Sequence, residues 1–353
     1  MEYRQLGRSG LRISTLTLGT MGFGGTGWAK AVGTIDVDGA RTQIDMAREA
    51  GVNLVDTADV YSAGLSEEIV GQALGKNRDD VLLATKVRMP MGSGPNDAGL
   101  SRHHVISGCE ASLRRLNTDR IDLYQVHEWD GQTPLEETLS ALHTLVTQGK
   151  VRYIGCSNYA AWQLMKALGT SERFGYERFV SQQVYYSLQN RDIEAEIVPA
   201  CIDQGVGILV WSPIAGGLLS GKYRRGADGN PVGPEGSRHL SSWSEPPVDD
   251  EDKLYATIDK LVEIGDGHGV SAAQVALAYT LRKPAVTSLI VGARTTDQLA
   301  DNLAAAQLEL SDAEVEALDE VSGEPLRYPF WHHRNTAGDR LSPADLSQLA
   351  RHL

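Results

Sequence analysis

Four polar side chains, Asp56, Tyr61, Lys86 and His127, have the types and the spacing to carry out proton transfer during carbonyl reduction. A free tyrosine titrates at about pH 10, and a neighbouring ammonium lowers that value, so Lys86 could make Tyr61 a usable proton donor. Asp56 would keep Lys86 charged and oriented, while His127 would hydrogen-bond the carbonyl oxygen and help to polarise it. The set predicts that Tyr61 delivers a proton to the alkoxide oxygen as hydride reaches the carbon.

Each of these residues alone also has an ordinary structural explanation. Asp56 could cap a loop, Lys86 could be a surface charge, and His127 could be a hydrogen-bonded core histidine. All four residues, however, lie at or just beyond the C-terminal ends of predicted apolar strands. Burying an Asp, a Lys and a His at strand ends costs several kcal/mol unless they satisfy one another. A shared site therefore explains the set better than separate roles do.

Short apolar, β-rich segments recur along the chain and provide these strand ends. Helix-like stretches with 3.6-residue periodicity separate them, with start signals at Thr133, Ser271 and Ser311. The alternation predicts parallel strands that are buried on both faces. Eight strands predict a (β/α)8 TIM barrel, with an open doubly wound sheet as the alternative. The strands are expected at residues 15–20, 53–58, 81–87, 121–127, 153–158, 179–186, 207–213 and 288–293.

Further segments complete the expected single barrel domain of residues 1–353. Residues 3–6 and 11–14 predict a β-hairpin that closes one end of the barrel. Residues 223–250 are rich in Gly, Pro and Ser, and residues 323–353 form an aromatic tail. Because long loops in a compact domain are usually functional or disordered, both segments are predicted to form a lid over the active site.

Residues 22–27, Gly-Phe-Gly-Gly-Thr-Gly, match the GxGxxG pattern of dinucleotide-binding folds. In such folds a helix begins immediately after the glycines, because its N-terminus holds the pyrophosphate. Here the next helix is expected to begin only around residues 36–38. The glycines therefore favour a flexible loop over a pocket.

Composition narrows the classes of partner and location. The net charge of −13 argues against nucleic acid as a main partner. Cys109, Cys156 and Cys201 form no CxxC pair, which indicates buried thiols in a reducing compartment. Neither a signal-peptide core nor a membrane-spanning run is expected. A soluble cytoplasmic protein without a membrane partner is predicted, and the sequence leaves homo-oligomer formation open.

A metal site is not expected. The adjacent pairs His103-His104 and His332-His333 lack a plausible third ligand, whereas catalytic and structural zinc sites need three or four ligands at suitable spacing. Proton transfer by the tyrosine needs no metal either.

Several short motifs follow one another along the chain. They are Asp56-Thr-Ala-Asp-Val-Tyr61, Ala84-Thr-Lys86, Asp122-Leu-Tyr-Gln-Val-His127, Gly155-Cys-Ser-Asn158, Gln183-Val-Tyr-Tyr186, Trp211-Ser-Pro213 with Gly221-Lys222, and Gly292-Ala-Arg294 through Asn302. Taken together and in this order, they resemble the motifs of the aldo-keto reductase superfamily, in its longer-chain bacterial-type branch, which resembles the potassium-channel β-subunit-like reductases. The resemblance implies an NADP-dependent oxidoreductase that reduces a small-molecule carbonyl substrate, with Asp56, Tyr61, Lys86 and His127 as the catalytic tetrad.

The resemblance also implies where NADPH binds. Ser157, Asn158 and Gln183 would hydrogen-bond the carboxamide, and Trp211 would stack on the nicotinamide ring. The backbone of residues 212–216 would follow the pyrophosphate, and the segment from residue 292 to 302 would hold the adenosine end, which agrees with the usual phosphate site of such barrels. The complete implied set is Thr20, Met21, Ser157, Asn158, Gln183, Trp211, Ser212, Pro213, Ile214, Gly216, Lys222, Arg238, Gly292, Arg294, Gln298, Asp301 and Asn302.

The extra phosphate of NADP needs cations. Some family members use Lys and Arg where this chain has Gly292 and Gln298. Lys222, Arg238 and Arg294 are therefore the candidate clamps, although Arg238 could equally be an ordinary surface charge.

Bulky side chains are predicted to line the substrate pocket, namely Phe23, Trp28, Met89, Trp129 and Trp331. Such a wall suits a bulky or alicyclic ketone, or an aromatic aldehyde, although each residue could instead serve packing. Glu128, Asp130 and His332 leave a sugar-like substrate open, because they could bind hydroxyl groups.

Two other functions remain to be weighed. A regulatory or redox-sensing barrel that binds the cofactor with little turnover is suggested by the resemblance to channel β subunits, which typically carry Asn where this chain has His127. A lyase or isomerase that uses Lys86 as a Schiff base would need no cofactor. A test for bound nicotinamide cofactor separates these alternatives.

Overall fold

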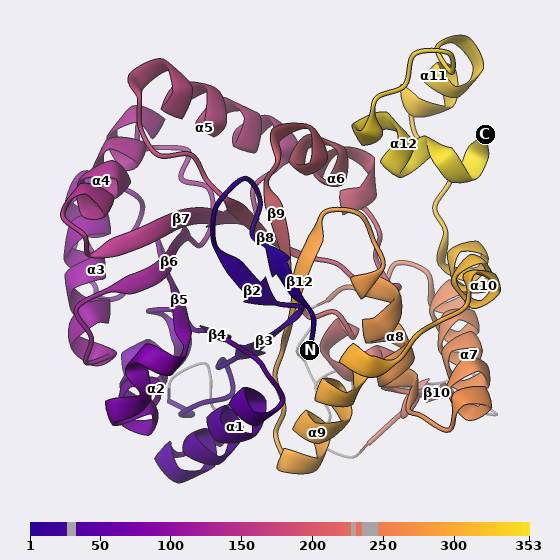
Figure 1. Ribbon diagram of the computed structural model, residues 1–353, viewed down its shortest axis with the longest axis horizontal. Helices are drawn as coiled ribbons and strands as arrows, with labels where there is room; N and C mark the ends of the chain where they lie inside the picture. Colours follow the sequence, from indigo (N-terminus) through magenta and orange to yellow (C-terminus); the bar gives the residue numbers. More distant parts are fainter. Residues whose placement is uncertain (27–32, 227–230, 235–245) are drawn as a thin grey trace.

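A closed barrel of parallel strands forms the centre of the molecule (Figure 1), as the sequence predicts. The computed structural model describes residues 1–26, 33–226, 231–234 and 246–353. Successive strands are neighbours, and the last strand pairs with the first. They are β3 (Leu16–Gly19), β4 (Leu54–Asp56), β5 (Leu82–Val87), β6 (Ile121–Val126), β7 (Val151–Ser157), β8 (Ser181–Tyr185), β9 (Gly207–Trp211) and β12 (Val286–Val291).

Helices surround the barrel and connect its strands (Figure 1). Two of them, α7 and α8, follow β9, and α9 and α10 follow β12. The helices are α1 (Val37–Glu49), α2 (Leu65–Leu74), α3 (Arg102–Arg115), α4 (Leu135–Thr147), α5 (Ala161–Phe174), α6 (Ile193–Gln204), α7 (Glu251–His268), α8 (Ala272–Leu281), α9 (Thr296–Ala304), α10 (Asp312–Ser322), α11 (Phe330–Thr336) and α12 (Pro343–Leu349). Short 3-10 helices are η2 (Tyr61–Gly64), η3 (Gly75–Asp80), η4 (Ala215–Ser220), η6 (Ala305–Gln307) and η7 (Ala350–His352).

Helix starts follow the expected capping chemistry in two of three places. Ser271 and Ser311 each accept a hydrogen bond from the backbone amide three residues on, which satisfies an orphan donor of the helix. The prediction for Thr133 is wrong, because α4 is capped at Pro134 without a side-chain bond. The Thr133 hydroxyl instead donates to Asp130 (2.7 Å).

An N-terminal hairpin closes the end of the barrel at which the strands begin, as predicted. It pairs β1 (Tyr3–Gln5) with β2 (Arg12–Ser14), and in Figure 1 it crosses the end that faces the viewer. Leu6 and Ile13 are fully buried beneath it. They form one hydrophobic cluster with side chains of β4, β5, β6 and β9, namely Leu54, Ala84, Leu123 and Leu209.

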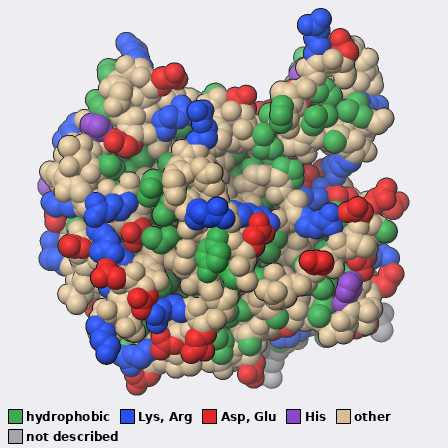
Figure 2. Space-filling model, in the orientation of Figure 1, with side chains coloured by type: hydrophobic (Ala, Val, Ile, Leu, Met, Phe, Trp, Pro, Cys, Tyr) green, Lys and Arg blue, Asp and Glu red, His purple; other side chains and the backbone are tan. Residues whose placement is uncertain are grey.

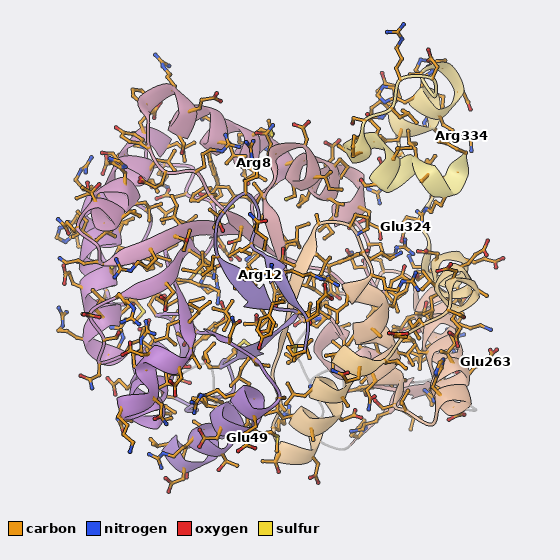
Figure 3. The ribbon with its side chains drawn as sticks, in the orientation of Figure 1. Arg8, Arg12, Glu49, Glu263, Glu324 and Arg334 are labelled. Carbon is orange, nitrogen blue, oxygen red and sulfur yellow. The ribbon has the colours of Figure 1, made fainter. Side chains whose placement is uncertain are left out.

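The tip of the hairpin approaches the barrel backbone closely. Gly7 has a φ of +54°, and a Cβ there would lie 2.3 Å from the Val180 carbonyl oxygen. The next amide, of Arg8, donates to the Gly205 carbonyl (2.7 Å). Figure 3 labels Arg8 near this tip and Arg12 on the second strand. Only glycine fits at position 7 without displacing this contact.

The barrel interior changes from apolar to polar within two residues. Side chains alternate between the faces of a strand, so residues two apart share the interior. The pairs are Leu54 and Asp56 on β4, Ala84 and Lys86 on β5, and Leu123 and Gln125 on β6. The first member of each pair belongs to the apolar layer under the hairpin, and the second is a buried polar group. The strand register thus collects polar side chains at the C-terminal end of the barrel.

The C-terminal tail lies beside the barrel, so the prediction that it forms a lid is wrong. In Figure 1, α11 and α12 extend past α6, and Figure 2 shows this part as a projection from the body. Figure 3 labels Glu324 in the segment that leads into it and Arg334 on α11. Because α12 packs against α6 and buries Leu349, the tail is held away from the strand ends.

The surface and the cysteines are unexceptional. Acidic and basic side chains are mixed over the face in Figure 2. Cys109, Cys156 and Cys201 are buried free thiols, as predicted. No helix within the described ranges is both long and apolar enough to cross a membrane.

Candidate active site

A cavity of about 880 Å³ opens at the C-terminal ends of the barrel strands. Its lining joins several strand ends to the segment after β9 and to helices α8 and α9. Asp56, Tyr61 and His127 contribute to the wall. Lys86 lies behind them and is fully buried. The structure therefore brings together the four residues that the sequence selects, in the polar layer of the barrel.

Lys86 is held by three oxygen atoms. Its Nζ donates to Asp56 Oδ2 (2.5 Å), to the Thr57 carbonyl (2.8 Å) and to the Tyr61 hydroxyl (3.2 Å). An ammonium has three donors, so this set satisfies Lys86 completely. Burial by itself lowers the pKa of Lys86, but Asp56 and Tyr61 outweigh it, and the pKa is raised overall. Lys86 is therefore a permanently charged group at neutral pH.

The second oxygen of Asp56 is held by two glutamines. Gln183 Nε2 donates to Asp56 Oδ1 (2.9 Å), and Gln125 Nε2 donates to the same atom (3.2 Å). A buried carboxylate needs such partners, since an unpaired one is strongly destabilising. Sequence reasoning missed Gln125. The alternation of β6, in which this polar residue follows Leu123 by two positions, could have indicated it.

Tyr61 is presented to Lys86 by a tight turn. The turn is η2, in which Ser62 and Ala63 both have left-handed backbone angles, with φ of 51° and 57°. Such angles are costly for residues other than glycine. The Ser62 hydroxyl donates to the Phe23 carbonyl (3.1 Å) and accepts from the Gly25 amide (3.0 Å). The loop after β3 therefore fixes the turn that carries the tyrosine.

The expectation that Lys86 lowers the pKa of Tyr61 below its usual value is wrong for the net effect. Burial raises the pKa of Tyr61, and the charge of Lys86 opposes this rise without reversing it. Tyr61 consequently keeps its proton at neutral pH. The ammonium can still assist by stabilising the phenolate that forms once the proton has left.

His127 is a neutral imidazole in this setting. Burial, followed by the positive charges of Lys86 and Arg88, lowers its pKa to about 3. Its ring centroid lies 6.0 Å from that of Tyr61, edge to face. Its Nδ1 is buried and has no hydrogen-bond partner in the described part of the chain. A neutral imidazole in this position can hydrogen-bond a neutral ligand without competing for the proton of Tyr61.

Sixteen residues of the implied cofactor set line this one cavity. Arg238 lies outside the described residues, and the binding roles of the others stay predictions. The lining residues are Thr20, Met21, Ser157, Asn158, Gln183, Trp211, Ser212, Pro213, Ile214, Gly216, Lys222, Gly292, Arg294, Gln298, Asp301 and Asn302.

Trp211 forms a fixed wall of the cavity. Its Nε1 donates to Asn158 Oδ1 (3.0 Å), and its ring packs against Tyr185 at a centroid distance of 4.9 Å. Asn158 Nδ2 in turn donates to the His127 carbonyl (3.2 Å). Asn158 has a φ of 56°, a left-handed angle that Asn tolerates better than most residues. Asn158 thus links the tryptophan to the strand end that carries His127.

The loop between β12 and α9 is organised by its own side chains. Thr295 caps α9 by accepting from the Gln298 amide (3.3 Å). Gln298 Oε1 accepts from the Arg294 amide (3.0 Å), and Asn302 Nδ2 donates to the Gly292 carbonyl (3.4 Å). Gln298 and Asn302 therefore shape the loop as well as line the cavity.

Asp301 has a structural partner that sequence reasoning missed. Its carboxylate accepts from Ser271 Oγ (2.8 Å) and Gln274 Nε2 (2.6 Å), both at the start of α8. These bonds join α9 to α8, which also supplies Ala273 and Leu277 to the cavity wall. Apolar residues of a helix such as Ala273 and Leu277 carry no sequence signal of a place in the cavity wall.

The predicted substrate wall is only partly found at the cavity. Met89 and Glu128 line it. Phe23 does not, because it is 1% exposed and packs in the hydrophobic core. Trp28 lies outside the described residues. The Asp130 carboxylate already accepts from the Leu100 amide (2.8 Å) and neighbouring groups, which leaves little room for a hydroxyl ligand.

The other two tryptophans of the predicted substrate wall, Trp129 and Trp331, do not line the cavity either. Trp129 packs edge to face against Tyr159 and Trp162, at centroid distances of 5.3 and 5.5 Å. Trp331 lies on α11 in the tail, 47% exposed, together with His332. Aromatic composition alone could not distinguish rim packing from a ligand wall.

The segment 223–250 reaches the cavity in its described parts. Tyr223, Pro234 and Pro246 line it. A two-stranded ribbon of β10 (Arg224–Arg225) and β11 (Pro231–Val232) forms part of the same connection. As predicted, no helix starts directly at the glycine-rich motif, because α1 begins only at Val37, with Asp36 as its cap.

The chain is similar to known proteins over most of its length. The model of the aldo/keto reductase family matches residues 15–322. An uncharacterized oxidoreductase, YrpG of Bacillus subtilis, is 38% identical over 92% of this chain and 97% of its own. A probable voltage-gated potassium channel subunit beta of Arabidopsis thaliana is 37% identical over 86% of this chain and 91% of its own. Versiconal hemiacetal acetate reductase of Aspergillus parasiticus is 37% identical over 91% of this chain and 96% of its own.

Next to Tyr61 in the fold lies a buried carboxyl group that the tetrad does not use. Asp59 is 1% exposed, and neither of its oxygens has a hydrogen-bond partner within the described ranges. Burial, and then the charge of Glu67, raises the pKa of Asp59 to about 8, against smaller opposing effects that include Arg115 and Lys86. Asp59 is therefore largely protonated in the folded protein at neutral pH.

We expect Asp59→Asn to change how stability depends on pH. A carboxyl whose pKa rises from 3.8 to about 8 on folding stabilises the fold fully below about pH 3.8 and loses this contribution as the pH rises toward 8. The wild type should lose up to about 1.4 kcal/mol per pH unit relative to the variant over this interval, then run parallel to it. Urea unfolding between about pH 5 and about pH 9 measures the difference. A pH-independent difference would contradict this assignment.

Proposed function

The chain belongs to the aldo/keto reductase family, and on this premise we propose that it is an NADPH-dependent enzyme that reduces an aldehyde or ketone to an alcohol. The observation that supports this most directly is the Tyr61 hydroxyl at 3.2 Å from a buried, fully paired Lys86. Tyr61 and His127 share the wall of one cavity, so a carbonyl oxygen could contact both.

Proton delivery falls to Tyr61 in this proposal. Its raised pKa keeps the hydroxyl protonated until a stronger base, the developing alkoxide, lies beside it. Lys86 then faces the phenolate oxygen and offsets its charge, while Asp56 keeps Lys86 in place. His127, neutral because its pKa is about 3, would hydrogen-bond the carbonyl oxygen and orient it.

The cavity residues fit a nicotinamide cofactor. When bound, a reduced nicotinamide would supply the hydride for the carbonyl carbon. Ser157 Oγ is buried at the cavity wall and has no hydrogen-bond partner among the described residues, which suits a carboxamide ligand. Trp211 offers an aromatic face that Tyr185 and Asn158 hold in place. Ser157, Asn158, Gln183 and Trp211 would bind and orient that ring.

NADP rather than NAD is favoured by two cations. Lys222 and Arg294 both line the cavity and are exposed, and in the described part of the chain neither has an ion-pair partner. The protein carries a net charge of −13, so a dianionic phosphate would otherwise be repelled. Cations that are free of internal partners are suited to charge-assisted bonds with that phosphate.

The substrate is proposed to be a bulky carbonyl compound. Val60 and Met89 line the same cavity as Tyr61 and give it apolar surface, and Glu128 adds one acidic group. The relative from Aspergillus parasiticus is named for the reduction of a versiconal derivative. A panel of aromatic aldehydes, alicyclic ketones and polyhydroxylated aldehydes therefore covers the relevant classes.

Tyr61→Phe should slow carbonyl reduction strongly without preventing cofactor binding. The variant removes only the proton donor, so kcat should fall by about 10²- to 10⁴-fold. Oxidation of NADPH and NADH is followed by absorbance across the carbonyl panel, and binding is followed by NADPH fluorescence. Tyr328→Phe, at a 74% exposed position, is the matched control and should behave as the wild type.

The same experiment separates the rival functions. A variant as active as the wild type would contradict the role of Tyr61. Tight NADPH binding without turnover of any carbonyl would favour a regulatory barrel, the alternative raised by the similarity to a probable potassium channel subunit beta. Failure to bind either nucleotide would overturn the proposed function altogether.

Lys222→Met and Arg294→Met should each weaken NADPH binding selectively. Loss of a charge-assisted bond to a phosphate corresponds to about tenfold weaker binding or more, whereas affinity for NADH should change little. The dissociation constants for both nucleotides, measured by fluorescence titration, test this. Lys76→Met, an exposed lysine on η3, is the control. Equal losses for the two nucleotides would contradict a role in phosphate recognition.

A further inference from the structure

A tight turn follows β8 and presents one buried amide side chain. Ser187 and Asn190 exchange backbone hydrogen bonds of 3.2 Å in both directions, so residues 187–190 form a closed turn. The Ser187 hydroxyl also accepts from the Gln189 amide (3.2 Å). Gln189 is only 9% exposed. The turn therefore fixes the backbone of Gln189, and burial restricts its side chain.

Gln189 connects two parts of the cavity wall. Its Oε1 accepts from the Tyr185 hydroxyl (2.6 Å), and its Nε2 donates to the Pro247 carbonyl (2.7 Å). Tyr185 packs on Trp211, at a centroid distance of 4.9 Å. Pro246, the neighbour of Pro247, lines the cavity. One side chain thus joins the aromatic wall to the end of the connection that follows β9.

The two ends of this contact are anchored in the same hydrophobic cluster. Leu188, next to Gln189, is buried there, and Val248, next to Pro247, packs against it. Leu218 and Tyr223, at the start of the connection after β9, belong to the same cluster. Packing therefore brings the backbone on both sides close together, and Gln189 adds the polar bond that joins the two segments.

We propose that Gln189 is a positioning residue that holds the Pro246–Pro247 segment against the Tyr185–Trp211 pair and thereby slows release of the nicotinamide cofactor. This inference rests on the proposed function, because it requires a cofactor in the cavity. The Gln189–Pro247 hydrogen bond then acts in retention of the cofactor and takes no part in the reduction of the carbonyl. Gln189 touches neither Tyr61 nor Lys86 among its described contacts.

Gln189→Glu tests the bond with little other change. Ionised glutamate keeps the acceptor for the Tyr185 hydroxyl but cannot donate to the Pro247 carbonyl, and its charge faces that oxygen, so the measurement is made at alkaline pH, where the carboxyl group carries no proton. NADPH dissociation, measured by stopped-flow fluorescence with no carbonyl present, should become about 3- to 10-fold faster. In the cofactor-free protein, hydrogen exchange of the amides of residues 248–250 should accelerate by a similar factor. Gln148→Glu, an exposed position at the end of α4, is the matched control and should change neither rate.

The outcomes are distinguishable. If the wild type binds NADPH and Gln189→Glu releases it at the wild-type rate, this inference fails and the proposed function stands. If the wild type binds no nicotinamide cofactor, both fail. Faster release together with an unchanged melting temperature supports a positioning role, whereas a lowered melting temperature with unchanged release would show that Gln189 only stabilises the fold.

Discussion

The buried ion pair between Lys86 and Asp56 is the interaction on which the rest of the site depends. Both side chains are removed from water, and the desolvation of two ions is repaid only when every donor and acceptor finds a partner. The structure meets this condition through the Thr57 carbonyl, Gln125 and Gln183. The remaining N–H of Lys86 donates to the Tyr61 hydroxyl. A constraint of folding therefore fixes the geometry that the proposed chemistry needs.

The barrel supplies this arrangement by register. Side chains two residues apart point to the same face of a strand, and in β4, β5 and β6 the first is apolar and the second polar. A hydrophobic layer sealed by Leu6 and Ile13 therefore lies under the charged layer. Water is thereby excluded from one side of the ion pair. On the other side, the strained turn of η2 places Tyr61 between Lys86 and the cavity.

The sequence was sufficient to predict elements with periodic patterns. The alternation of apolar strands and helices predicted all eight barrel strands, and the N-terminal pattern predicted the hairpin. The position of polar residues at strand ends predicted that Asp56, Lys86 and His127 converge. Properties that depend on burial could not be predicted. The pKa of Tyr61 is raised because desolvation outweighs Lys86, and Phe23 packs inward although its loop reaches the cavity. The lid prediction for the tail failed because α12 packs against α6. Aromatic content does not reveal which surface a helix packs on.

A kinetic double-mutant cycle on Lys86 and Tyr61 tests the central claim most directly, that Lys86 acts in catalysis through the hydroxyl of Tyr61. The rate of carbonyl reduction by bound NADPH is measured in single turnovers for the wild type, Lys86→Met, Tyr61→Phe and the double variant. Because residues that act as a unit are strongly non-additive, we expect the double variant to be no slower than Tyr61→Phe alone. A double variant slower by the product of the two single effects would show that the two residues act independently and would contradict this account.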